Sequence, residues 1–217
     1  MVNHMFLMVV YIFLVPMISL TQKKFCEEDY VGWSAPLDNL KDWRCDGVIY
    51  KKMQHPGNED GKLAMYAPDV VRGNDGRYYL YYSLADDVEM GVAVCDTPTG
   101  AYQFLGLVRY KDGTPWGRRP GDILPFDPGI INDEGRIYLY AGQGPMNRIH
   151  GYFSKGTRNT AYVVELEEDM MTMKTMPKEI VPSIKNSRGT EFKGHEFFEA
   201  NSIRKFNDKL RLFTAEP

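Results

Sequence analysis

Cysteine is scarce in this sequence, which has only Cys26, Cys45 and Cys95 among 217 residues. Three scattered cysteines are too few for a disulfide framework, and no pair has the short spacing of a zinc site. We therefore interpret them as free thiols. The four histidines form no HxH or HExxH arrangement. We accordingly predict neither a metal nor another cofactor.

An excess of positive charge is also missing, because the formal net charge is -3. No basic field would attract nucleic acid or anionic lipid, so we predict no nucleic-acid partner. Hydrophobic residues make up 43% of the chain and charged residues 25%, which is typical of a globular protein. The length suits one ordinary domain or part of a larger one.

Long apolar runs are absent except for one at the amino terminus, Met5–Leu20, which reads MFLMVVYIFLVPMISL. Its length fits the apolar region of a secretory signal, but MVNH before it has no Lys or Arg, and no small-x-small cleavage site follows. A membrane-spanning helix is less favoured still, because the run is short and Pro16 interrupts it.

A third interpretation of this run is an out-of-frame or mis-started translation. Back-translated with suitable codons and read one base earlier, residues Met8–Ile18 yield a turn followed by a strand-like segment. We therefore separate an atypical apolar segment, residues 1–22, from a main domain, residues 23–217. The compartment stays open between cytoplasmic and secreted.

Sustained helical periodicity is missing after Phe25, and short aromatic or β-branched runs take its place. The clearest of these predicted strands are Tyr78–Ser83, Gly91–Cys95, Arg136–Gly142 and Ala161–Leu166. Gly, Asn and Asp tolerate the positive φ that hairpin turns require. Turns of this kind are predicted at Asn74-Asp75-Gly76, Asp133-Glu134-Gly135 and Asn207-Asp208. The sequence predicts an all-β fold, with a hint of a helical turn only at Leu166–Met173.

An internal repeat is the most informative feature, and its copies are Ala67–Ser83, Phe126–Gly142 and Phe198–Glu216. Each copy has an acidic residue near its start, then apolar residues, a polar turn and a second apolar strand. The acidic residues, Asp69, Asp127 and Glu199, recur at intervals of about 60 to 70 residues, which suits four-stranded propeller blades with long loops. Because the first strand of each blade lines the central channel, we expect the three carboxylates to share one cavity.

These residues closely resemble family 43 of the glycoside hydrolases, from about Tyr30 to the carboxyl end. WSAPLDNLKDW resembles the end of the family's first blade, and YAPDV with DGRYYLYYS resembles its second. FDPGIINDEGRIYLYAG resembles the third blade and GHEFFEANSIRKFNDKLRLF the fourth. The resemblance implies a five-bladed β-propeller, of which about three to three and a half blades are present.

The resemblance also implies hydrolysis with inversion of configuration. Glu199 would be the general acid, and Asp127 would be the anion that keeps this acid protonated. The family's base comes from the start of blade one, where no Asp precedes Asp29. Asp29 reads as the lead-in to a strand, so we do not assign it as the base. The fifth blade, with its channel-lining His, is missing from the sequence.

Further residues are candidates for substrate contact. Asp69 is expected to line the cavity at the place equivalent to Asp127, and His195 and Glu196 could bind sugar hydroxyls or lie at a solvated strand edge. Phe126 and Trp116 could stack on a sugar ring, although core packing is the more common role for such residues.

The favoured hypothesis is a glycosidase of the α-L-arabinofuranosidase or β-xylosidase type that acts on an oligo- or polysaccharide. One alternative is a non-catalytic carbohydrate-binding or remnant propeller, and another is a fructan-acting hydrolase or a glycoside phosphorylase. An incomplete propeller exposes unpaired edge strands and half a core. We therefore expect poor solubility and no turnover from the chain as written.

Overall fold

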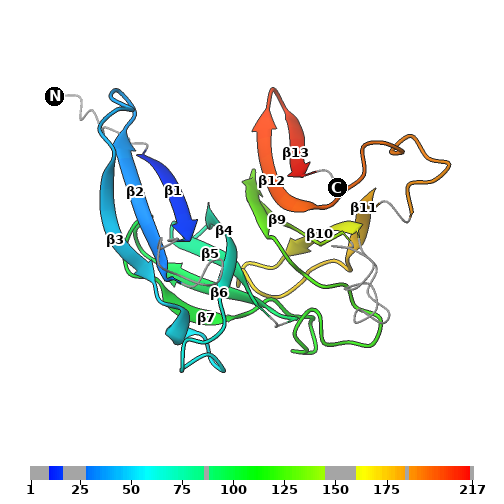
Figure 1. Ribbon diagram of the computed structural model, residues 1–217, viewed down its shortest axis with the longest axis horizontal. Coiled ribbons are helices and arrows are strands. Elements are labelled where there is room, and N and C mark those ends of the chain that lie inside the picture. Colours follow the sequence, from blue (N-terminus) through cyan, green and yellow to red (C-terminus); the bar gives the residue numbers. More distant parts are fainter. Residues whose placement is uncertain (1–9, 17–27, 86–87, 145–159, 184–185, 216–217) are drawn as a thin grey trace.

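The computed structural model describes residues 10–16, 28–85, 88–144, 160–183 and 186–215 as four antiparallel sheets in chain order (Figure 1). Blade one contains β1 (Val10–Pro16), β2 (Tyr30–Pro36) and β3 (Arg44–Tyr50). Blade two contains β4 (Met65–Arg72), β5 (Tyr78–Leu84), β6 (Met90–Cys95) and β7 (Gln103–Leu107). Blade three contains β8 (Gly129–Asp133), β9 (Arg136–Ala141), β10 (Thr160–Leu166) and β11 (Lys178–Pro182). Blade four contains β12 (Glu199–Phe206) and β13 (Lys209–Ala215).

The first strands of the four sheets lie beside one another. Strand β4 contacts both β1 and β8, and β8 also contacts β12. In Figure 1, blade one stands at the left, blade two lies below and beside it, blade three lies at the right, and blade four stands above blade three. This is the arrangement of successive propeller blades, about three and a half of them, as the sequence predicts.

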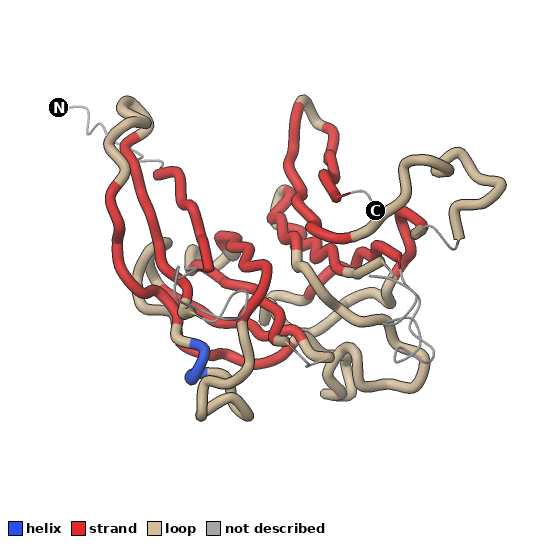
Figure 2. The backbone as a smooth tube through the Cα atoms, viewed as in Figure 1, coloured by secondary structure: helices blue, strands red, loops and turns tan. Residues whose placement is uncertain are grey.

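Strands and the loops and turns that join them account for nearly all of the described chain (Figure 2). The one short 3-10 helix in the described ranges is Lys52–Gln54. Leu166–Met173 holds turns and bends rather than helix. Among the described residues, no helix has the length and apolar character needed to cross a membrane.

The three predicted hairpin turns each join the first two strands of a blade. In blade four, Asn207 and Asp208 have φ values of 47° and 61°, so both central residues of this two-residue turn lie in the left-handed region. Such turns match the twist of the paired strands. The local sequence therefore explains where each inner hairpin reverses.

Two apolar cores join the first three blades. One core, between blades one and two, is built around Tyr30, Tyr50 and Tyr82, and the Tyr50 and Tyr82 hydroxyl oxygens are 2.7 Å apart. The other joins blades two and three and includes Tyr81 and Trp116. Most of the strand tyrosines thus pack rather than face solvent.

Trp116 has no exposed surface. It lies in the second core, and its backbone N–H donates to Val108 O at 2.9 Å. A ring enclosed by protein on all sides is not open to a sugar, so the predicted stacking role of Trp116 is wrong. Trp116 instead packs in the core between blades two and three, which was the alternative interpretation.

Part of the apolar amino-terminal segment belongs to blade one. Strand β1 pairs with β2 along its whole length, from Val10 opposite Pro36 to Pro16 opposite Tyr30. Residues 1–9 and 17–22 of this segment lie outside the described residues. The signal-like and mistranslated interpretations of residues 1–22 both stay predictions.

Candidate active site

A left-handed residue lies within two residues of the start of the inner strand in blades two, three and four. These residues are Ala67, Asp127 and Ala200, with φ values of 49°, 50° and 62°. Non-glycine residues rarely adopt such φ values, and those that do cluster at functional sites. The repeat seen in the sequence is therefore also a repeat of backbone conformation.

Hairpin register shows which residues of the repeat are equivalent. Gly129 lies opposite Tyr140 in blade three, and Asp69 lies opposite Tyr81 in blade two. Since these two tyrosines occupy the same place in the repeat, Asp69 is equivalent to Gly129. Ala67 is then the residue of blade two that corresponds to Asp127. The predicted equivalence of Asp69 and Asp127 is wrong by two residues.

Asp127 is buried, with 6% of its surface exposed. Its Oδ2 accepts a hydrogen bond of 2.7 Å from the backbone N–H of Ala200. Burial raises the pKa of Asp127 to about 6. The hydrogen bond from Ala200 opposes this shift, and the negative charge of Glu199 adds to it.

Glu199 is the first residue of β12 and is half-buried. The chain just before it is held on two sides. Phe198 donates its N–H to Ala215 O at 3.1 Å, and Phe198 O accepts from Gly144 N–H. The peptide just after Glu199 contacts the carboxylate of Asp127. Two acids that lie 72 residues apart in the chain are therefore neighbours at the amino-terminal ends of β8 and β12.

The carboxylate of Asp69 joins two blades. Its Oδ2 accepts from Ile130 N–H of β8 at 2.9 Å, and its Oδ1 accepts from Val70 N–H at 3.0 Å. Burial raises the pKa of Asp69 to about 6, although these two hydrogen bonds and the charge of Arg204 oppose the shift. Asp69 thus ties β4 to β8, much as Asp127 ties β8 to β12.

Two half-buried aromatic rings precede the left-handed residues of blades two and three. Tyr66 comes before Ala67, and Phe126 comes before Asp127. Their ring centroids lie 5.9 Å apart at an interplanar angle of 51°. In the repeat, Tyr66 and Phe126 are equivalent to Glu199, so an aromatic pair and the candidate acid occupy successive blades.

His195 and Glu196 lie in the loop that leads into β12. His195 is exposed, and its backbone N–H donates to the backbone oxygen of Phe192 at 2.9 Å. Glu196 accepts from Ser187 Oγ at 2.7 Å. The backbone N–H of Gly194 lowers the pKa of Glu196, and the Ser187 hydroxyl adds to this effect. In the chain, these two residues precede Glu199 by four and three positions.

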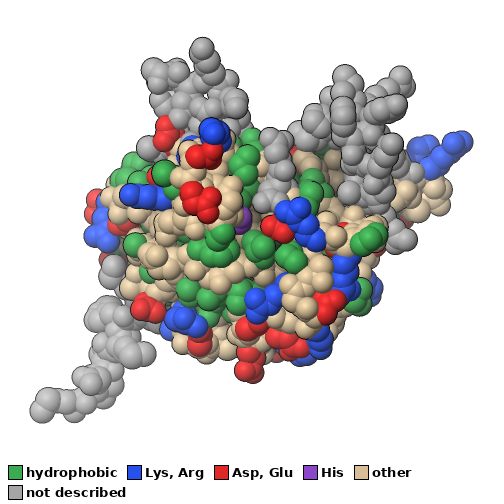
Figure 3. Space-filling view, turned by 90° about the horizontal axis from the view of Figure 1, so that it is seen from below, with side chains coloured by type: hydrophobic (Ala, Val, Ile, Leu, Met, Phe, Trp, Pro, Cys, Tyr) green, Lys and Arg blue, Asp and Glu red, His purple; other side chains and the backbone are tan. Residues whose placement is uncertain are grey.

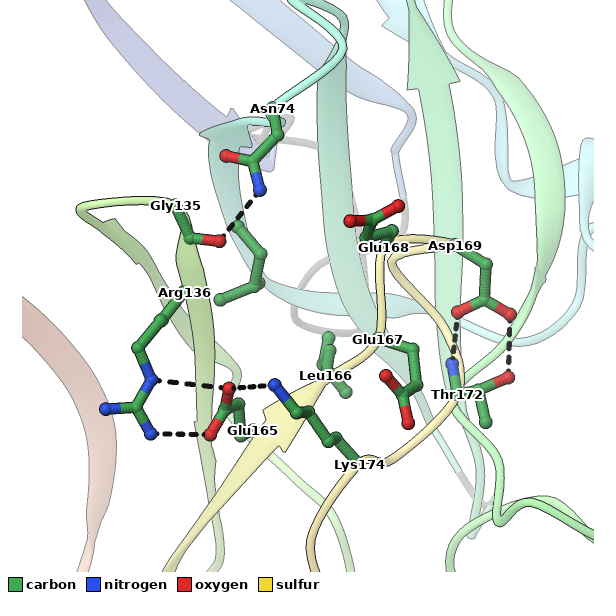
Figure 4. A pocket seen from close by; sticks show the side chains of 11 residues that line it. Asn74, Gly135, Arg136, Glu165, Leu166, Glu167, Glu168, Asp169, Thr172 and Lys174 are labelled. Atoms are coloured by element: carbon green, nitrogen blue, oxygen red, sulfur yellow. Dashed lines mark hydrogen bonds and ion pairs between the residues drawn. The ribbon is translucent and has the colours of Figure 1, made fainter.

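A pocket of about 510 Å³ lies near the opposite end of the inner strands (Figure 4). Its wall includes Gly135, which follows the last residue of β8, whereas Asp127 precedes the first. In this pocket, Glu165 accepts from Arg136 at 2.7 Å and from Lys174 at 2.8 Å. These two cations lower the pKa of Glu165 to about 2. A carboxylate paired in this way holds the fold together and is a poor proton donor.

Several residues beside the acids escaped the analysis of the sequence, namely Tyr66, Gly129, Ala200 and Asn201. Aligning Ala67-Pro68-Asp69 with Asp127-Pro128-Gly129 and Ala200-Asn201-Ser202 would have pointed to them. In the described ranges, no cluster of His, Cys, Asp and Glu could hold a metal ion.

Comparison with solved structures identifies the class of fold. An α-L-arabinofuranosidase from Clostridium thermocellum ATCC 27405 superposes with a TM-score of 0.61 over 93% of this chain and 57% of its own, at 23% identity. RS223-β-xylosidase superposes with a TM-score of 0.60 over 85% of this chain and 58% of its own, also at 23% identity. With the four sheets in sequence, this likeness makes the chain part of a β-propeller.

The family follows from the sequence comparison. Residues 34–217 match the model of glycosyl hydrolases family 43, so the chain belongs to that family. A xylosidase/arabinosidase of Thermoclostridium stercorarium is 52% identical over 186 residues, which cover 85% of this chain and 37% of that protein. An extracellular endo-α-(1→5)-L-arabinanase of Thermotoga petrophila is 30% identical over 94 residues, 36% of this chain and 20% of that protein. The chain thus spans well under half the length of these two relatives.

Proposed function

We propose that the protein is a glycoside hydrolase that acts on arabinose- or xylose-containing glycans. The observation that supports this proposal best is the contact at the acid pair, where Asp127 Oδ2 accepts from the backbone N–H that follows Glu199. Membership of family 43 and the 52% identity to a xylosidase/arabinosidase support the same reaction class. The carbohydrate is the only substrate or partner that we propose.

In the proposed reaction, Glu199 donates its proton to the glycosidic oxygen while the bond from that oxygen to the anomeric carbon breaks. Water attacks the anomeric carbon from the opposite face, and a base takes its proton, which inverts the configuration. Asp127 does not touch the reacting bond. It is proposed to act on Glu199 instead, since its carboxylate is held next to that acid by the N–H of Ala200.

The neighbouring residues are proposed to bind the sugar. The faces of Phe126 and Tyr66 offer half-buried apolar surface next to Asp127. Asp69, His195 and Glu196 stay proposed contacts for hydroxyl groups, because carboxylates and imidazoles form hydrogen bonds with them.

A second candidate function is carbohydrate binding without hydrolysis. The observation that favours it is the composition of β1, VYIFLVP, which offers no carboxylate to act as base from blade one. Asp29, the first Asp of the chain, is already engaged, since its Oδ1 accepts from Lys52 N–H at 2.9 Å. The two functions differ only in whether water is activated.

An external nucleophile tests the role of the acid independently of the base, for which β1 offers no carboxylate. Phenyl arabinofuranoside and phenyl xyloside need an acid to release phenol, and azide ion needs no base to attack the anomeric carbon. We expect this chain to bind these glycosides and to form a glycosyl azide of inverted configuration when azide is added. In water alone the release of phenol should be far slower, because β1 offers no carboxylate to act as the base of the proposed hydrolysis. Glu199→Gln should lower the rate of glycosyl azide formation by about 10² or more.

Glu168→Gln is the matched control, since Glu168 is an exposed residue of the turn after β10. It should leave binding and rate unchanged. Equal rates for Glu199→Gln and the unmodified chain would show that Glu199 is not the acid. Hydrolysis in plain water would exclude the non-catalytic alternative, and failure to bind either sugar, measured by calorimetry, would overturn the proposed carbohydrate function.

A further inference from the structure

Two reciprocal hydrogen bonds clasp β8 to β12 at the acid pair. The side chain of Asp127 accepts from the backbone of Ala200 at 2.7 Å, and Asn201 Nδ2 donates to the backbone oxygen of Asp127 at 2.9 Å. The segment that leads into β8 and the start of β12 thus each offer one side chain to the main chain of the other. Asp127 and Asn201 are both buried, so the hydrogen bond from Asn201 Nδ2 to Asp127 O is shielded from water.

Asn201 occupies a position that is proline in the other two copies of the repeat. The residue after the left-handed one is Pro68 in blade two, Pro128 in blade three and Asn201 in blade four. Proline has no side-chain donor, so neither Pro68 nor Pro128 can hold a neighbouring carbonyl in this way. Among these three blades, only blade four has a side-chain donor at this position, and that donor faces Asp127, a residue of the candidate site.

The stability of the fold does not by itself account for an asparagine here. Its Oδ1 is buried and has no hydrogen-bond partner within the described part of the chain. An unmade bond of this kind is destabilising, and an apolar residue would avoid it. The backbone oxygen of Asp127 can only accept a hydrogen bond, so the atom of Asn201 that faces it must be the donor, Nδ2. The carbonyl that it holds belongs to a residue with φ of 50°, a strained conformation for aspartate.

We propose that Asn201 is a positioning residue, which holds Asp127 in its left-handed conformation and so sets the Asp127 carboxylate against Glu199. This assignment rests on the proposed function of the acid pair. Asn201 acts on the main chain of Asp127 and does not touch the substrate. Without its amide donor, Asp127 relaxes, the bond to Ala200 lengthens, and the two carboxyl groups lose their relative position.

Amide hydrogen exchange tests the clasp without any substrate. In the unmodified chain the N–H of Ala200 should be protected, and in Asn201→Ala it should exchange at least about tenfold faster, because its acceptor is no longer fixed. Asn132→Ala is the matched control. Asn132 Nδ2 also donates across blades to a backbone oxygen, that of Arg72 at 3.1 Å, but at the far end of β8. This control should leave the exchange of Ala200 unchanged.

The Glu199-dependent formation of glycosyl azide supplies the second readout. Asn201→Ala should lower its kcat by about 10², as misplacement of a reacting group does, with KM changed by less than about twofold. Asn201→Asp has the shape of asparagine but lacks the donor and adds a charge beside Asp127. It should be no faster than Asn201→Ala, whereas Asn132→Ala should retain the full rate.

Three results would overturn the proposal: unchanged exchange of Ala200 in Asn201→Ala, recovery of the rate in Asn201→Asp, or an equal loss of rate in Asn132→Ala. The first of these results can be measured whether or not the chain is active, because amide exchange at Ala200 needs no substrate. An unmodified chain without any Glu199-dependent reaction would overturn the proposed function alone, since exchange at Ala200 still decides whether Asn201 holds the pair.

Discussion

Asp127 combines burial, a left-handed backbone and a nearby negative charge. Each of the three works against a stable fold, because burial and Glu199 penalise its ionised form and φ of 50° is disfavoured for aspartate. Two hydrogen bonds, from Ala200 and from Asn201, offset part of this cost. A residue that is destabilising and yet firmly held is typical of a functional site.

The raised pKa of Asp127 predicts a pH-dependent gain in stability when the charge is removed. A carboxyl whose pKa is about 6 when folded and 3.8 in its ordinary state binds more protons in the folded protein between these values. Stability is therefore lost as the pH rises through this window. Asp127→Asn cannot ionise, so its free energy of unfolding relative to the unmodified chain should rise by on the order of 2 kcal/mol from about pH 4.5 to about pH 8.

Denaturant unfolding at the two pH values measures this difference, and any pH-independent effect of the amide cancels. Asp208→Asn, in the exposed turn of blade four, controls for the chemical change itself. If the advantage of Asp127→Asn were the same at both pH values, Asp127 would not carry a raised pKa. The same variant should lose the Glu199-dependent reaction.

Strands β8 and β12 approach each other closely because β8 begins with glycine. A Cβ on Gly129 would lie 2.9 Å from Asn201 O and 3.1 Å from the Asn201 carbonyl carbon. Both are main-chain atoms, which cannot move aside alone as the end of a flexible side chain can. Gly129 is therefore part of the reason why the acid pair can form across two blades.

Gly129→Ala should force β8 and β12 apart. We expect a loss of about 1–3 kcal/mol in the free energy of unfolding, as is typical of overpacking, together with a lower rate of the Glu199-dependent reaction. Gly106→Ala is the matched control in β7, since its Cβ would meet chiefly the flexible end of Met171, at 2.6 Å from Sδ. Thermal unfolding and kinetics compare the two, and an equal effect of both variants would contradict this account.

Apolar side chains stay exposed on the first and last sheets of the molecule. On blade one these are Trp33, Trp43 and Val48, and on blade four they are Phe206, Leu210 and Phe213. On the face seen in Figure 3, acidic and basic side chains lie around a group of hydrophobic side chains. The rings of Phe206 and Phe213 pack on each other, with centroids 6.4 Å apart, and both are about half exposed. Exposed apolar faces of this kind favour association.

The 217-residue polypeptide is therefore expected to self-associate through its end sheets. Phe213→Ser should raise the concentration at which association begins by about tenfold, because a contact worth about 1.4 kcal/mol is lost. Met176→Ser is the control, as Met176 is 66% exposed but lies in the loop before β11. Sedimentation velocity measures both, and an equal effect of the two variants would place the contact elsewhere.

The sequence predicts the local features of this fold well. The strands and the three hairpin turns depend on residues that are neighbours in the chain, so their patterns can be read directly. The equivalence of Asp69 and Asp127 failed because it matched the two residues by type, as acids near the start of a repeat. The pairing places Asp69 opposite Tyr81 and Gly129 opposite Tyr140, so Asp69 corresponds to Gly129. Strand register, which the pairing determines, decides which residues correspond.

By itself, the sequence determined the all-β class, the repeat of the blades, the family and the two acids of the candidate site. Only the tertiary structure decided that Trp116 is enclosed in a core, and that Asp127 meets the peptide after Glu199 and the side chain of Asn201. These contacts join residues more than 70 positions apart, and they depend on how one blade packs on the next. No pattern within a single strand encodes such an approach, because it requires Gly129 on one strand and Asn201 on the other.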